Sequence, residues 1–225
     1  MRKETQSDPS PDNPQSEEDS ILFVITAPSG AGKSSICWAV IERVQGLAFS
    51  VSHTTRAPRQ HERDGVDYYF VDDETFDRMI REDRFLEWAE VYGRRYGTSR
   101  DEVERARQNG IDLLIEIDRQ GARNIRAGFP EAVGVFLMPP SFRSLNERLM
   151  KRGSESAEEI NKRLAIAADE TKDYPLFDYA VVNDDFDKAV AMLEAIIWAE
   201  RNKVKHQEKA LHKIMSGIRK EQAPE

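Results

Sequence analysis

One stretch near the N-terminus constrains the fold more than any other. ITAPSGAGKSS, from Ile25 to Ser35, continues the apolar run ILFVIT and leads into SSICWAVIERV. An uninterrupted apolar run of this length is typical of a strand covered on both faces, as parallel sheets require. The stretch after the glycines is compatible with a helix. A strand, a glycine loop and a helix in this order predict a phosphate-binding loop in an α/β fold.

The chemistry of such a loop is specific. Backbone N–H groups surround the phosphates of a nucleoside triphosphate, a lysine neutralises their charge and a hydroxyl ligates Mg²⁺. Lys33 and Ser34 match the last two roles, and Ser34 is the predicted metal ligand. Ala27 stands where the strict pattern has glycine, but the densest phosphate contacts fall later in the loop. The predicted loop residues are Ala27, Pro28, Ser29, Gly30, Ala31, Gly32, Lys33, Ser34 and Ser35.

Further apolar runs repeat the buried-strand pattern along the chain. IDLLIEID, AVGVFLM and YAVVN each precede a helix-compatible stretch, and Asp184 and Asp185 suit the positive end of the last helix. Strands that alternate with helices predict a doubly wound parallel sheet. We assign this core to residues 21–46, 99–149 and 176–201.

Three other segments have a different composition. Residues 47–98 contain short, aromatic, strand-like runs and predict an inserted β-rich subdomain. Residues 150–175 are charged and helical, with a capping box at Ser156 and Glu159, and predict a mobile helical lid. In the extension 202–225, Val204, Leu211, Met215 and Ile218 form an apolar stripe. We expect this helix to dock on its own domain, and contact with a second copy is the alternative.

Composition and charge exclude several classes of partner and structure. Residues 1–20 are polar and predict a disordered acidic tail. The net charge of −8 argues against nucleic-acid and anionic-membrane partners. The single cysteine, Cys37, excludes an intramolecular disulfide, and we expect it to lie in the core of a protein from a reducing cytoplasm. No run is long and apolar enough to span a bilayer.

A second phosphate site is indicated by SVSHTTRAPRQHERDGVDYYF, Ser50 to Phe70. Arg56 and Arg59 lie three residues apart, with paired tyrosines shortly after. Two guanidinium forks and a phenol can hold one phosphate dianion from several sides. Taken alone, however, this loop would be interpreted as an exposed basic segment.

Several further motifs accompany this loop, and together they indicate its function. APSGAGKSS, SVSHTTRAPR, DYYFV, FLEWAEVYGRRYGTSR, IEIDRQGA and VVNDDFDKA together resemble the guanylate kinase family over about Ile21 to Arg201. The resemblance implies a P-loop kinase with a GMP-binding region and a helical lid, and the reaction ATP + GMP to ADP + GDP, with dGMP as a further acceptor. It also implies Mg²⁺ with ATP as the donor.

The resemblance carries over site residues motif by motif. The implied GMP-phosphate ligands are Arg56, Arg59, Tyr68 and Tyr96, and the implied guanine-binding residues are Ser52, Glu87, Thr98 and Asp118. The implied catalytic lid arginines are Arg148, Arg152 and Arg163, acting with Lys33, and Asn183 is expected near the adenine. Glu116 stands where the family usually has aspartate, and we leave it out of the metal ligands.

The chemistry of guanine agrees with this assignment. Guanine presents N1–H and its exocyclic amine as adjacent donors, which one carboxylate such as Glu87 can accept together. Adenine has an acceptor at N1 and would leave buried lone pairs unpaired. Two alternatives remain at this point: a related ribosyl bisphosphate kinase, which needs no guanine pocket, and an interaction module of the same fold, which typically has a degraded phosphate loop.

Overall fold

The core of the molecule is a parallel sheet. The structure, a computed structural model, describes residues 20–91, 93–151 and 157–221. Five parallel strands follow the order β2-β7-β1-β8-β9. They are β1 (Leu22–Thr26), β2 (Leu47–Phe49), β7 (Asp112–Glu116), β8 (Val133–Met138) and β9 (Tyr179–Val182). The order reverses at β1, and the glycine loop opens there, at the carboxyl edge where such sheets bind ligands. This confirms the predicted doubly wound α/β fold.

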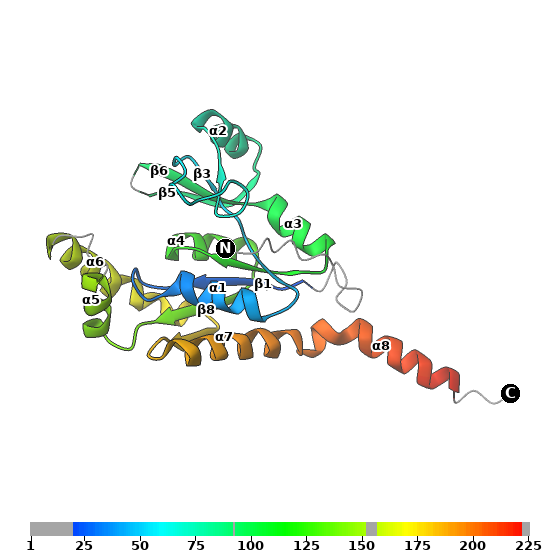
Figure 1. Ribbon diagram of the computed structural model, residues 1–225. Coiled ribbons are helices and arrows are strands. Elements are labelled where there is room, and N and C mark those ends of the chain that lie inside the picture. Colours follow the sequence, from blue (N-terminus) through cyan, green and yellow to red (C-terminus); the bar gives the residue numbers. More distant parts are fainter. Residues whose placement is uncertain (1–19, 92, 152–156, 222–225) are drawn as a thin grey trace.

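Helices cover both faces of this sheet (Figure 1). The helices are α1 (Lys33–Arg43) and α7 (Phe186–Arg201) on one face, α3 (Arg100–Gln108) and α4 (Arg119–Gly128) on the other. β1 is buried along its whole length, which explains its continuous apolar sequence. Cys37 lies fully buried in the cluster between α1 and the sheet, as predicted.

A second, smaller sheet stands beside the core, above it in Figure 1. Its strands, in the order β4-β3-β6-β5, are β3 (His53–Thr54), β4 (Tyr69–Phe70), β5 (Phe85–Val91) and β6 (Arg94–Ser99), and α2 (Asp73–Arg81) packs against it. The predicted boundary at residue 47 is wrong, because β2 pairs in parallel with β7 of the core sheet. α2 also lies inside the region expected to be β-rich.

The segment expected as a lid is helical in the part that the structure describes. The chain forms α5 (Phe142–Lys151), α6 (Ala157–Glu170) and the 3₁₀ helix η1 (Thr171–Leu176). Leu145 and Leu149 of α5 pack with Ile160 and Ala167 of α6 in one buried cluster. The two helices therefore form one unit that begins before residue 150. The capping-box serine, Ser156, lies outside the described residues.

The C-terminal helix α8 (Val204–Glu221) contradicts one prediction. It continues beyond α7 and extends away from the body of the molecule (Figure 1). Its apolar side chains are exposed, from 40% at Ile218 to 69% at Val204, so the expectation of a helix docked on its own domain is wrong. The predicted N-terminal tail, apart from Ser20, lies outside the described residues. Within the described chain, helices long and apolar enough to cross a membrane are absent.

Candidate active site

The glycine loop presents open backbone donors at the start of α1. Gly32 is the N-cap residue of α1 and has φ of 92°, a left-handed conformation that favours glycine. This cap provides no side-chain acceptor. The first N–H groups of the helix are therefore available to an anion, and the helix dipole favours negative charge at the same place.

Lys33 and Ser34 are held by the end of β7. The Lys33 ammonium donates to the Ile117 carbonyl at 2.6 Å and lies 3.8 Å from the Glu116 carboxylate. The Ser34 hydroxyl donates to the same Glu116 oxygen at 2.6 Å. Glu116 therefore contacts the predicted metal ligand directly, although we left it out of the metal site.

The side chain of Asn183 contacts the glycine loop directly. Its side-chain amide is buried and donates to the Ala31 carbonyl at 2.7 Å. A Cβ atom on Gly32 would lie 2.7 Å from the same amide nitrogen, so only glycine permits this approach. Arg148 of α5 donates to the Asn183 carbonyl at 2.8 Å, which connects the first lid arginine to the loop.

Three of the predicted guanine-binding residues, Glu87, Thr98 and Asp118, lie on β5, on β6 and at the start of α4. Glu87 on β5 is buried, and its carboxylate accepts from the Thr98 hydroxyl at 2.9 Å and from the Thr98 N–H at 3.2 Å. Burial, together with the nearby charge of Asp118, raises the pKa of Glu87 to about 7. Asp118 is the N-cap of α4, where it accepts from the Gly121 N–H at 2.8 Å. A Cβ atom on Gly121 would lie 2.9 Å from Glu87, so glycine leaves room for this carboxylate.

The predicted phosphate ligands surround Arg56. Its guanidinium lies 5.3 Å from the centre of the Tyr68 ring, and the Tyr68 and Tyr96 rings are 5.9 Å apart. Glu62 accepts two hydrogen bonds from Arg56, and these bonds raise the pKa of Arg56 above its ordinary value. Arg59 is exposed and reaches this cluster through its backbone N–H.

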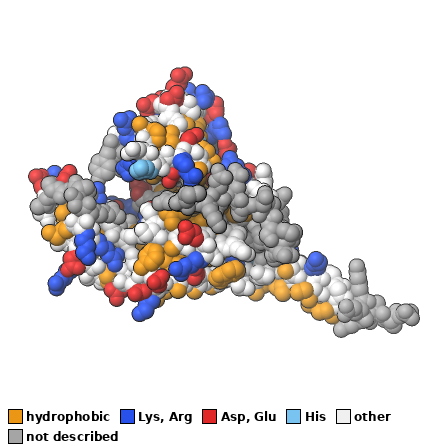
Figure 2. Space-filling model, viewed as in Figure 1, with side chains coloured by type: hydrophobic (Ala, Val, Ile, Leu, Met, Phe, Trp, Pro, Cys, Tyr) orange, Lys and Arg blue, Asp and Glu red, His pale blue; other side chains and the backbone are white. Residues whose placement is uncertain are grey.

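One cavity joins the two halves of the site. It has a volume of about 180 Å³, and its lining includes Ser34 and Glu116 of the core and Ser52, Glu62 and Tyr68 of the smaller sheet's side. Figure 2 shows the surface hollowed between the smaller sheet and the lid helices. Residues predicted from separate motifs therefore meet around one space.

The lid helices reach the phosphate loop from the other side. Arg163 of α6 lies with its guanidinium 3.4 Å from the Ser29 hydroxyl, and the Ser29 N–H donates to Glu170 at 3.4 Å. Burial raises the pKa of Glu170 above its ordinary value. Arg152, the remaining predicted lid arginine, lies outside the described residues.

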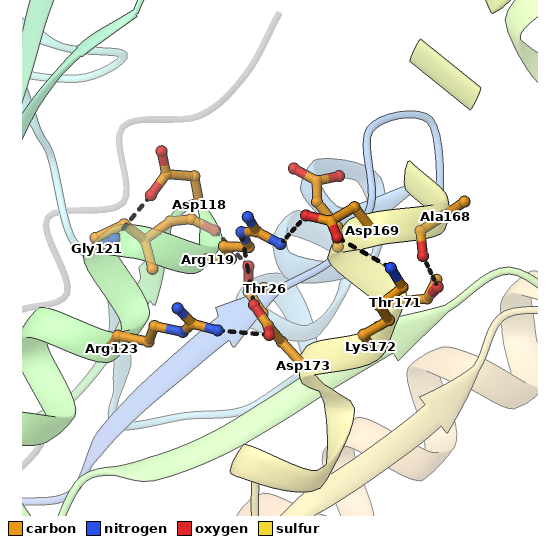
Figure 3. A network of polar contacts seen from close by, with 12 residues as sticks. Thr26, Asp118, Arg119, Gly121, Arg123, Ala168, Asp169, Thr171, Lys172 and Asp173 are labelled. Carbon is orange, nitrogen blue, oxygen red and sulfur yellow. Dashed lines mark hydrogen bonds and ion pairs between the residues drawn. The ribbon is translucent and has the colours of Figure 1, made fainter. Parts of the chain in front are cut away.

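Salt bridges fix the end of α6 and the 3₁₀ helix η1 to α4, and we call this part of the chain, which carries Asp169 and Asp173, the lid base. Figure 3 shows Arg119 and Arg123 directed toward two aspartates of the lid base. Arg119 donates to Asp169 at 2.7 Å, and Arg123 donates to Asp173 at 2.6 Å. Asp173 is buried, and its second oxygen lies 3.6 Å from Arg119. These contacts join the helix that begins at Asp118 to the lid.

The acidic residues Glu62, Glu116 and Glu170 were missed as site residues. Glu62 lies three residues after Arg59, a spacing that could have indicated a partner for the basic loop. Glu116 lies at the end of a predicted strand, where an acidic residue can assist a metal ion. It was left out because glutamate has a longer side chain than the aspartate that is usual at this position in the family. Glu170 meets Ser29 across 141 residues of sequence, and no local pattern signals such a contact.

Comparison with known proteins gives one consistent result. The family model described as Guanylate kinase matches residues 20–200. A guanylate kinase of Coxiella burnetii is 47% identical over 197 residues, which cover 88% of this chain and 96% of that protein. One from Symbiobacterium thermophilum is 49% identical over 181 residues, 80% of this chain and 86% of that protein. The crystal structure of guanylate kinase from Anaplasma phagocytophilum matches with a TM-score of 0.67 and 32% identity, covering 82% of this chain and 87% of that one.

Proposed function

The chain belongs to the guanylate kinase family and phosphorylates GMP to GDP with ATP, and we propose how its residues divide this task. On the donor side, the backbone N–H groups of the loop 27–35, to which Pro28 contributes none, bind the ATP phosphates, and Lys33 neutralises their charge. Asn183 and Arg148 keep this loop in shape through the Ala31 and Asn183 carbonyls. The position of Asn183 near the adenine stays a prediction beside this contact.

On the acceptor side, we propose that two sets of residues bind GMP. Arg56, Arg59, Tyr68 and Tyr96 bind the phosphate, and Ser52, Glu87, Thr98 and Asp118 bind the guanine. The cavity that joins Ser34 to Ser52 and Tyr68 is the observation that carries this assignment, since it lets an acceptor phosphate approach the donor loop. The two sets bind the phosphate and the base, and neither binds the sugar. Because dGMP differs from GMP only in the sugar, dGMP should also be an acceptor.

The residues present suit Mg²⁺ held largely by water and phosphate. Mg²⁺ prefers oxygen ligands and keeps several waters. Ser34 and Glu116 offer adjacent oxygens 2.6 Å apart, whereas groups of three or more acidic, histidine or cysteine ligands are absent from the described residues. Ser34 would bind the ion and Glu116 would hold one of its waters. When bound, the ion neutralises charge on the phosphate oxygens.

Catalysis needs alignment and charge neutralisation, without a covalent nucleophile from the protein. We propose that a GMP phosphate oxygen attacks the γ-phosphate directly. Lys33 and the lid arginines Arg148, Arg152 and Arg163 stabilise the negative charge that spreads over the transferring group. Closure of the lid helices α5 and α6 over the site excludes water, which would otherwise compete as acceptor.

Replacement of Glu87 tests the guanine pocket. Glu87→Ala removes the acceptor for both guanine donors. We therefore expect the preference for GMP over AMP to fall about a hundredfold. ADP formation with GMP, AMP, CMP and UMP as acceptors measures the preference. Glu90→Ala, at an exposed position on the same strand, is the matched control. An unchanged preference for guanine in Glu87→Ala would refute the pocket assignment.

We also propose a homo-oligomer formed through α8, in a protein that acts in the cytoplasm. The exposed apolar side chains of α8 support contact with a second copy, because burial of such a stripe is favourable. The single, buried cysteine suits a reducing compartment.

A further inference from the structure

Glu62 links the two arginines of the GMP-phosphate set. Its carboxylate accepts from both terminal nitrogens of Arg56, each at 2.8 Å. The same carboxylate accepts from the backbone N–H of Arg59 at 2.8 Å. The side chains of Arg56 and Glu62 are only 16% and 17% exposed, so this arrangement is well enclosed.

The contacts of Arg56 use one edge of its guanidinium. Glu62 takes the edge formed by Nη1 and Nη2, and the Ala57 carbonyl accepts a further hydrogen bond from Nη1 at 2.8 Å. The Nε–H and the second N–H of Nη2 take no part in these bonds. Those two groups form the other bidentate edge of a guanidinium, which matches the oxygens of a phosphate.

Aromatic rings restrict the same side chain further. The guanidinium carbon lies 5.3 Å from the centre of the Tyr68 ring and 5.8 Å from that of Phe70. The phenol of Tyr96 lies near this guanidinium and contributes to the raised pKa of Arg56. Arg56 is thus held among two members of its own phosphate set before any substrate binds.

We propose that Glu62 is a positioning residue, which fixes Arg56 so that its second edge is presented to the GMP phosphate. This inference rests on the proposed role of Arg56 as a phosphate ligand. A free arginine loses rotamer entropy each time it binds, whereas a fixed one has lost it already. The alternative is that the negative charge of Glu62 mainly opposes the phosphate. The two effects act on the KM for GMP with opposite signs.

Two substitutions separate geometry from charge. Glu62→Gln removes the charge and replaces one acceptor by a donor, and Glu62→Asp keeps the charge but shortens the reach. We expect both to raise the KM for GMP about tenfold, as loss of ground-state binding does, with kcat almost unchanged. A lower KM in Glu62→Gln with an unchanged KM in Glu62→Asp would show charge opposition and overturn the proposal. An unchanged KM in both would overturn it as well.

A coupled variant shows whether Glu62 acts through Arg56. If it does, adding Glu62→Gln to Arg56→Ala should raise the KM for GMP no further than Arg56→Ala alone. An additional tenfold increase would overturn the positioning role. If Arg56→Ala itself leaves the KM unchanged, the proposed phosphate ligand is wrong, which is a failure distinct from that of Glu62.

The control is an ion pair between the same subdomain and α3 of the core. Asp83 lies 3.3 Å from Arg100, and both side chains are largely exposed. Asp83→Asn should leave the KM for GMP and kcat as in the wild type. Circular dichroism and the KM for ATP, measured on every variant, report folding and the donor site separately, and both should be unaffected by the Glu62 substitutions.

Discussion

We propose that the charge state of Glu87 decides how well guanine is bound. It is buried, its pKa is raised to about 7, and its hydrogen bonds from Thr98 are the main contacts that favour the charged form. Only the carboxylate can accept both guanine donors, because a protonated carboxyl has given up part of its acceptor capacity. GMP binding and loss of the Glu87 proton should therefore be linked.

This linkage predicts a pH-dependent KM for GMP. As the pH falls below about 7, protonated Glu87 accumulates in the free protein, and the KM should rise toward tenfold per pH unit. The GMP phosphate also titrates, with a pKa of about 6. Glu87→Gln is the control, because it retains the phosphate titration and loses that of the carboxyl. The KM for GMP is measured for the wild type and Glu87→Gln from about pH 5.5 to about pH 8, a range that brackets the pKa values of both groups. Parallel profiles would show that GMP binding is not linked to loss of the Glu87 proton.

The same titration should appear in the folding equilibrium. A raised pKa means that the folded protein holds the proton more tightly than the unfolded chain. The stabilisation is complete below the unfolded value near 4.5 and is lost as the pH rises through about 7. Glu87→Gln should therefore gain stability relative to the wild type at pH 8, by about 1 to 3 kcal/mol in urea unfolding.

At the scale of elements, α4 connects the proposed guanine pocket to the lid helices. Its N-cap, Asp118, belongs to the proposed guanine set, and its first two turns carry Arg119 and Arg123, which hold the lid base. The lid in turn places Arg163 and Glu170 at Ser29 of the phosphate loop. α4 thus lies between the proposed acceptor pocket and the lid helices that contact the glycine loop.

Asp173 is the contact most sensitive to substitution in this arrangement. Asp173→Ala leaves Arg123 without its partner, but that arginine is half-exposed and can be hydrated, so the cost should be about 1 to 2 kcal/mol. We expect kcat to fall several-fold, because Arg163 and Glu170 lose their support, while the KM for GMP stays unchanged. Steady-state kinetics and urea unfolding measure the two effects.

Asp169→Ala is the matched comparison at the lid base. The Arg119–Asp169 pair is more exposed, so its loss should cost less stability than the loss of Asp173. An equal loss of kcat in both variants would contradict the importance given to the buried aspartate.

For the whole molecule, the unusual feature is α8. A helix of 18 residues is about 27 Å long, and this one extends from the body with Val204, Leu211, Ile214, Met215 and Ile218 exposed. An apolar stripe of this kind is normally covered in a folded protein. Contact with a second copy would cover it.

Substitutions within the stripe test this association on the full chain. Leu211→Lys combined with Met215→Lys changes side chains that are 44% and 50% exposed, so the folded monomer should lose no more than about 0.5 kcal/mol. We expect light scattering to show an oligomer for the wild type and a monomer for the double variant, as for a chain truncated after Arg201. GMP kinase activity should be retained. A monomeric wild type at micromolar concentration would contradict the proposed oligomer.

The sequence alone determined the local features of this protein. The buried strand β1, the left-handed glycines Gly30 and Gly32 and the N-cap of α4 are set by apolar pattern and backbone preference within a few residues. Combined with the order of the motifs, these signals were sufficient for the parallel α/β fold and for a list of candidate site residues.

Tertiary structure decided what depends on distant partners. β2 joins the core sheet because β7, more than sixty residues later, offers it a hydrogen-bonding edge. Glu116 reaches Ser34, and Glu170 reaches Ser29, only after the chain has folded. Whether the stripe of α8 is covered likewise depends on where the helix lies and not on its spacing. Apolar periodicity shows that a face must be buried, but the geometry of packing selects what buries it.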